Sequence, residues 1–182
     1  CMSHPVIFNR KLLAKNRSRI AGSFQNFDFL LENALGRLTD RLLDLSRSFE
    51  LVLNLGARNG MLEKIWPKEL KTPKFIHADI SEKMIGDAVN HAARVVCDEE
   101  FLPFAPNSLD AVVSCLSCHW ANDLPGVLKQ ITETLKPDSL FLVSRKAIDA
   151  AAEPHESVLP TPFSNVDITT SLFLIVYIEI FI

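Results

Sequence analysis

The residues of this chain best suited to chemistry are two glycines and an aspartate that follow apolar runs. Gly56 and Gly60 enclose a turn after the run Leu51–Leu55, and a helical pattern begins directly behind it. Glycines at such a turn let backbone N–H groups come close to a ligand. Asp79 ends the next apolar run, where a carboxylate can accept hydrogen bonds from both hydroxyls of a ribose. Together these residues predict a site for a nucleoside-containing cofactor.

A second acidic position, Asp98 with Glu99, follows a short β-branched run. An acidic side chain there can accept a hydrogen bond from the exocyclic amine of adenine, and the alternative is an exposed acidic loop. The glycine spacing differs from that of the dinucleotide fingerprint, and Arg58 hinders the close approach of a diphosphate. We therefore expect a smaller cofactor without phosphates.

A third group of residues, Cys115, Cys118 and His119, spells the C-x-x-C-H string that attaches c-type haem. The string ends an expected central strand, where a macrocycle would disrupt the sheet. A zinc site needs four ligands and the chain has no second cysteine pair, so we expect no metal site. The cysteines are expected to be small, half-buried side chains. His119 is a candidate general base or substrate-orienting residue, with a structural hydrogen bond as the alternative.

The composition of the 182-residue chain limits the classes of function. Apolar residues make up 48% of the chain, which is enough for a buried core. The net charge of −3 and the pI of about 6.0 argue against a general nucleic-acid-binding surface. Four cysteines at this length do not indicate a disulfide framework, so we expect reduced thiols in an intracellular compartment.

Apolar runs alternate with helical patterns through the middle of the chain, which predicts an α/β fold. In such a fold a mostly parallel sheet carries helices on both faces, and the ligand crevice lies at the carboxyl ends of the strands. The expected strands are 51–55, 75–79, 94–97, 109–114 and 140–144, and the expected helices are 61–67, 82–92 and 126–135.

Helical periodicity also covers residues 24–45, and a basic segment precedes it at 6–19. The basic segment is either a solvated helix face, or a lid or docking surface. As a lid, it would close over the site together with Phe24 and Phe27. We expect three parts in the chain: a helical lid segment (1–48), a cofactor-binding core (49–145) and an irregular tail (146–182).

The tail ends in an apolar run at 172–182. This run is too short to cross a bilayer as a helix, which takes ~20 residues. It is either a buried strand that completes the sheet or an adventitious, aggregation-prone end.

On these residues the chain resembles the class I S-adenosylmethionine-dependent methyltransferases with a type 11 domain. The glycine turn resembles the first motif of that superfamily, Asp79 matches its ribose-binding acid, and Asp98 with Glu99 matches its adenine motif. Residues 102–104 and 109–114 match the segment written LPF…FDxVxS.

The resemblance covers about residues 6–144 and implies a Rossmann-like methyltransferase fold with S-adenosylmethionine as cofactor. It implies the following cofactor-binding residues: Asn54, Gly56, Ala57, Gly60, Asp79, Ile80, Asp98, Glu99 and Ser114.

A narrower resemblance joins four segments to the mitochondrial complex I assembly-factor methyltransferases and their bacterial relatives. These segments are Ile7–Leu13, Phe27–Leu30, Asp98–Phe104 and His119–Pro125. The group is related to the malonyl carrier-protein methyltransferase of biotin synthesis, and its mitochondrial member is reported to hydroxylate an arginine.

The narrower resemblance implies a methyltransferase-family protein that acts on a protein in respiratory complex I assembly. The alternatives are an arginine hydroxylase, a non-catalytic cofactor-binding assembly protein, and a carrier-protein carboxyl methyltransferase. It further implies a protein substrate or partner, no nucleic acid, no transmembrane segment, and peripheral membrane association as an option. The implied location is the mitochondrial matrix for a eukaryotic source and the cytoplasm for a bacterial one.

The chain departs from the superfamily pattern at three places. Asn54 stands where an acid is usual, and Arg58 stands where glycine is usual, beside the expected position of a cationic ligand. After about Ser144 the resemblance ends, so we expect a truncated or aberrant end in which the last strands of the fold are missing or replaced.

Overall fold

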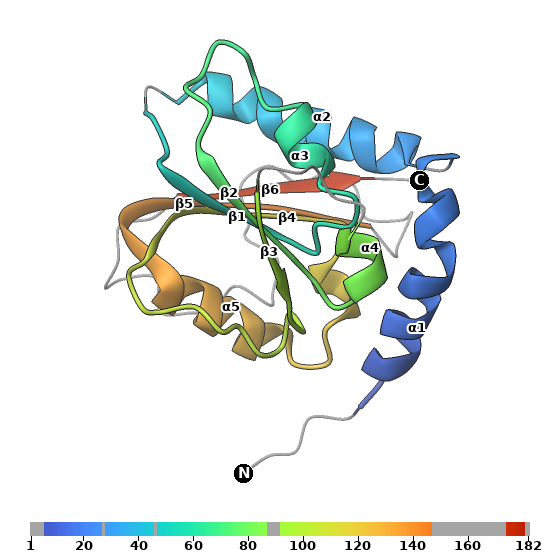
Figure 1. Ribbon diagram of the computed structural model, residues 1–182. Helices are drawn as coiled ribbons and strands as arrows, with labels where there is room; N and C mark the ends of the chain where they lie inside the picture. The colour runs from blue at the N-terminus through green and yellow to red at the C-terminus, as the bar shows by residue number, and fades with distance from the viewer. Residues whose placement is uncertain (1–5, 27, 46, 87–91, 147–173, 181–182) are drawn as a thin grey trace.

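A computed structural model describes residues 6–26, 28–45, 47–86, 92–146 and 174–180. Six strands form one sheet in the order β3-β2-β1-β4-β5-β6, and every neighbouring pair is parallel (Figure 1). The strands are β1 (Leu51–Leu55), β2 (Lys74–Asp79), β3 (Ala93–Val96), β4 (Leu109–Cys115), β5 (Leu135–Lys146) and β6 (Leu174–Ile180).

Helices lie on both faces of this sheet, as Figure 1 shows for α2 and α3 on one side and α5 on the other. The parallel sheet with helices on both faces confirms the predicted α/β fold. The helices are α1 (Arg10–Ile20), α2 (Phe29–Leu43), α3 (Met61–Lys64), α4 (Glu82–Gly86) and α5 (Leu124–Thr134), with 3₁₀ turns η1 (Ala21–Asn26) and η2 (Cys118–Trp120).

The first core lies between α2 and one face of the sheet. Apolar residues of α2 recur at helical spacing and are buried against side chains such as Val52, Val113 and Leu142. Phe24 packs at the margin of this core, whereas Phe27 lies outside the described residues. The buried residues of α2 in this core are Leu31, Ala34, Leu35, Leu38 and Leu42.

The second core lies between α5 and the opposite face. Val127, Leu128 and Ile131 of α5 pack with the alternate residues of the central strands, which include Leu53 and Phe141. Strand residues alternate between the two faces, so each central strand contributes to both cores and is mostly apolar.

Helix starts follow local capping chemistry. The side chain of Asn9 accepts a hydrogen bond from Leu12 N at 3.0 Å and begins α1. Asp123 accepts from Gly126 N at 2.9 Å and begins α5, where Pro125 occupies the first turn. Both caps satisfy backbone donors that have no partner inside the helix.

The strand after α5 begins earlier than predicted. The expected strand began at residue 140, but β5 starts at Leu135 and includes residues 136–138. The pairing with β4 shifts between Leu109 and Ala111, and Asp138 has a φ of 62°. This irregularity lets the chain pass through a turn-like sequence and remain paired.

The expected helices at 61–67 and 82–92 correspond to α3 and α4. The first ends at Lys64, and the second is described only to Gly86, because residues 87–91 lie outside the described part. Residues 147–173 of the predicted tail also lie outside it. The apolar run that follows forms β6, which pairs with β5 in parallel. Among the described residues, no helix combines the length and apolarity needed to cross a membrane.

Candidate functional site

The candidate site lies at the carboxyl ends of β1, β2 and β4, and its turn is built around Gly56. Gly56 has a φ of 72°, and its N–H donates to Ala78 O at 2.8 Å, beside the bond from Ala57 N to the same oxygen at 2.9 Å. A Cβ on Gly56 would clash with the side chain of Ser117. Both the backbone conformation and the lack of space therefore require glycine here.

The end of the turn starts α3. Gly60 has a φ of 71° and is the N-cap of this helix, and its N–H donates to Ala57 O at 2.9 Å. The predicted cofactor residues Gly56, Ala57 and Gly60 thus form one continuous backbone loop at the carboxyl end of β1.

Asp79 is fully buried at the end of β2 and uses both carboxylate oxygens. Its Oδ1 accepts from Ser81 N at 2.9 Å, and its Oδ2 accepts from Arg58 N at 3.0 Å. The Nη1 of Arg17 donates to the same Oδ2 at 3.0 Å. Ile80, the next predicted cofactor residue, is half-buried directly behind Asp79. The predicted ribose-binding carboxylate is therefore in place and is occupied by an arginine.

Glu99 and Asp98 follow β3 and face the same crevice. Glu99 is 1% exposed and accepts hydrogen bonds from Ser117, Arg10 and Arg17. Burial raises the pKa of Glu99, but the charges of Arg17 and Arg10 and the Ser117 hydrogen bond outweigh burial and hold it below 4.5. Glu99 is therefore an ionised carboxylate in the interior, which excludes a purely exposed acidic loop.

The two arginines come from α1, which Figure 1 shows beside α4 at one end of the sheet. Arg17 is 5% exposed and bridges Asp79, Glu99 and Ser117 Oγ, the last at 3.0 Å. Arg10 binds Asp98 through Nε and Nη2 at 3.0 and 2.7 Å. These contacts support the lid interpretation of the basic segment and exclude a fully solvated helix face.

Arg58 occupies the turn with an unusual backbone. Its φ is 48°, which costs an arginine on the order of 1 kcal/mol and costs glycine nothing. Its guanidinium donates to Cys115 O at 2.9 Å and to Leu116 O at 2.6 Å. Burial, followed by repulsion from Arg17, lowers the pKa of Arg58 to about 10. Leu116 has a φ of 50°, so two strained residues meet across the crevice.

Asn54 contacts a buried histidine on the neighbouring strand. Asn54 and His77 are register partners, and Asn54 Nδ2 lies 3.4 Å from His77 Nδ1. The Nε2 of His77 lies 3.2 Å from a carboxylate oxygen of Glu63 in α3. Burial lowers the pKa of His77, although Glu63 opposes the shift. Asn54 thus belongs to a buried polar chain, and its role toward a cofactor stays a prediction.

Of the predicted residues near the end of β4, Ser114 lies inside the strand and His119 lies in the turn η2 that follows it. Ser114 is buried, and its Oγ lies 3.0 Å from Cys118 Sγ. Burial raises the pKa of the Cys115 and Cys118 thiols to about 12, so both stay protonated and unreactive at neutral pH. His119 lies in η2, and its ring centroid is 5.3 Å from that of Trp120.

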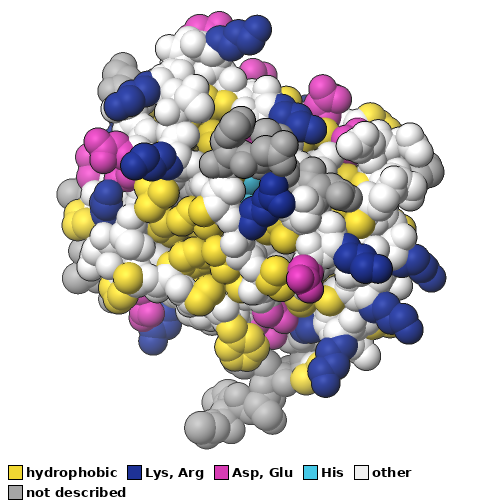
Figure 2. Space-filling view, in the orientation of Figure 1, with side chains coloured by type: hydrophobic (Ala, Val, Ile, Leu, Met, Phe, Trp, Pro, Cys, Tyr) yellow, Lys and Arg dark blue, Asp and Glu magenta, His cyan; other side chains and the backbone are white. Residues whose placement is uncertain are grey.

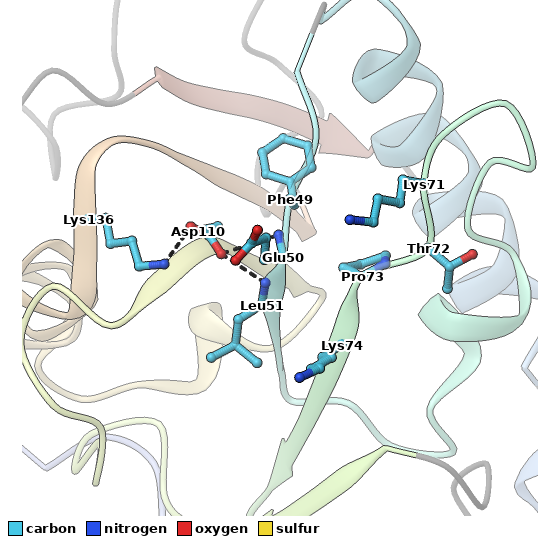
Figure 3. Close-up of a pocket in the computed structure, with 9 residues that line it drawn as sticks. All are labelled: Phe49, Glu50, Leu51, Lys71, Thr72, Pro73, Lys74, Asp110 and Lys136. Atoms are coloured by element: carbon cyan, nitrogen blue, oxygen red, sulfur yellow. Dashed lines mark hydrogen bonds and ion pairs between the residues drawn. The ribbon is translucent and has the colours of Figure 1, made fainter.

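A hollow of about 490 Å³ lies at the other edge of the sheet, at the amino ends of the strands (Figure 3). Asp110 lies at its wall, accepts from Leu51 N at 2.9 Å and pairs with Lys136 at 2.8 Å. Burial raises the pKa of Asp110, but the hydrogen bonds from Lys136 and Leu51 N outweigh burial, so the pKa lies below its ordinary value. None of the predicted cofactor residues lines this hollow, so it is not the candidate site.

The surface carries mixed charge on the face drawn in Figure 2, where Lys and Arg side chains are interspersed with acidic and apolar ones. Within the described part of the chain, no three His, Cys, Asp or Glu side chains are grouped as a metal site requires.

The crevice residues fit an adenosyl cofactor by type and position. The glycine turn has no space for a side chain, so the backbone itself can approach the cofactor. The buried carboxylate after β2 suits the ribose hydroxyls, and the acidic pair after β3 suits the adenine amine. Sequence reasoning missed Ser117 and the partners of Arg10 and Arg17. The cluster of arginines in one short segment was the available signal, but their partners lie 62 to 110 positions away.

The comparisons with known proteins agree with this geometry. The family model described as a methyltransferase domain matches residues 53–143. The arginine-hydroxylase NDUFAF5, mitochondrial, of Homo sapiens is 41% identical over 141 residues, which are 75% of this chain and 41% of that protein. The malonyl-[acyl-carrier protein] O-methyltransferase 1 of Coxiella burnetii is 27% identical over 137 residues, which are 75% of this chain and 48% of that protein.

Solved structures share the fold. A chain in the complex of the Haloferax volcanii Trm112 methyltransferase activator with a methyltransferase superposes with a TM-score of 0.59 at 22% identity, over 69% of this chain and 57% of that one. This chain spans less than half the length of the curated relatives named above.

Proposed function

Because this chain belongs to the methyltransferase-domain family, we propose that it binds S-adenosylmethionine in the crevice at the carboxyl ends of β1, β2 and β4. The buried carboxylate of Asp79 behind the Gly56 turn is the observation that carries the proposal. The family assignment and the fold confirm the predicted Rossmann-like methyltransferase class and its cofactor, S-adenosylmethionine.

Each part of the crevice has a proposed task. Asp79 accepts hydrogen bonds from the ribose hydroxyls, Asp98 and Glu99 face the adenine, and the Gly56 turn admits the amino-acid portion. Asn54, Ala57, Gly60, Ile80 and Ser114 complete the predicted binding set. When bound, the cofactor supplies a methyl group activated by its sulfonium sulfur.

The residues beyond the crevice orient an acceptor. We propose that His119 orients or deprotonates the acceptor group, because it follows β4 beside the crevice. Trp120 packs edge-on against Phe8, with ring centroids 5.4 Å apart, and covers this end of the site. The acceptor is proposed to be a protein in respiratory complex I assembly, and the location to be the mitochondrial matrix, on the strength of the mitochondrial relative.

Calorimetric titration tests the binding step. We expect S-adenosylmethionine and S-adenosylhomocysteine to bind in the micromolar range, NAD not to bind, and Asp79→Ala to lose both ligands. Asp110→Ala, a carboxylate at the other edge of the sheet, is the matched control and should bind like the unmodified chain. A folded chain that gives no heat with either adenosyl ligand would contradict the proposal.

Arginine hydroxylation is the second candidate function, because the relative with 41% identity is named for it. The two functions differ in the mass they add to an acceptor. Incubation with arginine-containing protein substrates and mass spectrometry would distinguish an added methyl group from an added oxygen. A chain that binds the cofactor but modifies no acceptor would favour a non-catalytic assembly role, and modification of malonyl carrier protein would favour the carboxyl methyltransferase alternative.

A further inference from the structure

The charged groups in the crevice are paired with one another across it. Three carboxylates, from Asp79, Asp98 and Glu99, meet two guanidiniums from α1, those of Arg10 and Arg17. The carboxylates belong to the core of the fold, whereas both arginines come from one helix at the amino-terminal end of the described chain. One helix therefore supplies two positive charges against the three negative charges of the crevice.

Arg17 stands where a ligand of Asp79 would stand. Its Nη1 lies 3.0 Å from Asp79 Oδ2 and 3.3 Å from Glu99 Oε1, and its Nη2 lies 3.0 Å from Ser117 Oγ. A guanidinium at hydrogen-bond distance fills the space in which ribose hydroxyls would approach the same carboxylate. The oxygen Oδ2 also accepts from Arg58 N, so it has no capacity for another donor.

The helix that carries Arg17 is held mainly by polar contacts. Arg17 is the only buried residue within α1, and Leu12 and Ile20 are 52% and 41% exposed. The other side-chain contacts of the helix include the ion pairs of Arg10, a hydrogen bond from Arg10 Nη1 to Trp120 O at 3.0 Å, and the hydrogen bond between Ser18 and Ser81 at 2.8 Å. An element with little apolar burial opens locally at a lower free-energy cost than the core does.

A neighbouring positive charge destabilises Arg17 at its place in the crevice. The guanidinium of Arg58 is half-buried in the same crevice, and its charge and that of Arg17 repel each other. Departure of α1, which carries both Arg10 and Arg17, would leave three carboxylates facing a crevice beside Arg58 alone. The crevice then gains an acidic wall that suits a ligand with hydroxyl, amine and ammonium donors.

We propose that α1 is a self-blocking cover of the cofactor crevice, in which Arg17 competes with the cofactor for Asp79 and must leave before the cofactor binds. This inference rests on the proposed function, because it concerns the same crevice. Such a cover differs from a lid that closes onto a bound cofactor. Ligand binding releases α1 from the crevice and does not hold it there.

Hydrogen exchange of the unmodified chain tests the direction of the movement. S-adenosylhomocysteine is the probe, and exchange is followed by mass spectrometry with and without it. We expect the amides of residues 10–20 to exchange faster with the ligand bound, while those of α5 stay unchanged. Slower exchange of residues 10–20 with the ligand bound would overturn the proposal, because it would show that α1 closes onto the cofactor.

Calorimetry on variants tests the competition. We expect Arg17→Ala to bind S-adenosylhomocysteine at least about tenfold more tightly than the unmodified chain, because the competitor is gone. Arg19→Ala changes an exposed arginine of the same helix and should leave the affinity unchanged. Weaker binding by Arg17→Ala, with binding by the unmodified chain intact, would overturn the cover and leave the proposed function standing. No binding by any of the three chains would overturn both.

Discussion

At the carboxyl edge of the sheet, Asp79 is 1% exposed and is paired with Arg17, which lies 62 positions earlier in the chain. At the amino edge, Asp110 is paired with Lys136, which has a side chain 41% exposed. Asp110 also accepts from Leu51 N, on the strand next to its own (Figure 3). The first pair joins a helix to the core of the sheet, whereas the second joins neighbouring strands at the surface.

The difference shows which charges serve the fold and which are available for a ligand. Burial of an ion pair costs desolvation that its attraction barely repays, so a buried pair is weak evidence for stability. The carboxyl edge accepts this cost in the pairs of Arg10 with Glu99 and of Arg17 with Asp79 and Glu99, and it also holds Arg58 and Leu116 at positive φ. Concentrated strain and buried charge of this kind are typical of functional sites. The amino edge also holds two residues at positive φ, but these are Asn107 and Asp138, residue types that tolerate this conformation, and its ion pair is partly exposed.

The largest expected effect comes from Gly56→Ala. The new methyl group would enter the side chain of Ser117 at a φ that disfavours alanine, so we expect a loss of about 3 kcal/mol in the free energy of unfolding and loss of cofactor binding. Gly36→Ala is the control, since nothing lies within 4 Å of its added Cβ. It sits inside α2 and should stabilise the chain by about 0.5–1 kcal/mol. Equal urea midpoints for the two variants would show that the turn is not constrained.

Glu99→Gln is expected to have the next largest effect. It removes one charge from a buried cluster and leaves Arg17 with fewer partners, so we expect a loss of about 2 kcal/mol at neutral pH. Folding lowers the pKa of Glu99 from its ordinary value of 4.5. The Glu99 carboxylate therefore contributes its full stabilisation above that ordinary value, and the contribution is lost as the pH falls through the folded-state pKa. The difference between the two chains should therefore shrink in acid. Urea unfolding at about pH 7 and about pH 4 measures it, and a difference that grows in acid would reverse the assigned sign.

Arg58→Gly separates strain from charge at the same edge. The substitution relieves a φ of 48° and removes a positive charge beside the crevice. We expect the affinity for S-adenosylmethionine to rise about tenfold and that for S-adenosylhomocysteine to rise less, because only the former carries a positive sulfonium. Equal gains for both ligands would show that the space vacated by the arginine, and not its charge, controls binding. Arg37→Gly, an exposed residue of α2, controls for a general effect of lost charge.

The sequence predicted the strands and turns that form this site better than the side-chain contacts inside it. Strand β1 lies at the predicted bounds because an apolar run ends at a glycine turn, which is a local signal. The early start of β5 was missed because Leu135 and Leu140 both pair with β4, and the turn-like residues 136–138 lie in the irregularity between these two pairings. The contact of Asn54 with His77 depends on the register of two strands, and that of Arg17 with Asp79 depends on how α1 packs. Neither can be read from local spacing.

Asp110→Asn is expected to have the smallest effect, and it tests the amino edge directly. Asparagine keeps an oxygen that can accept from Leu51 N and loses only the charge that attracts Lys136. Exposed ion pairs contribute little and are screened by salt, so the loss of stability should be smaller than for Glu99→Gln and should vanish at high ionic strength. Cofactor affinity should not change, because this edge lies at the opposite ends of the strands. A loss that matches that of Glu99→Gln and persists at high salt would mean that both edges depend on charge to the same degree, and the contrast between them would have to be abandoned.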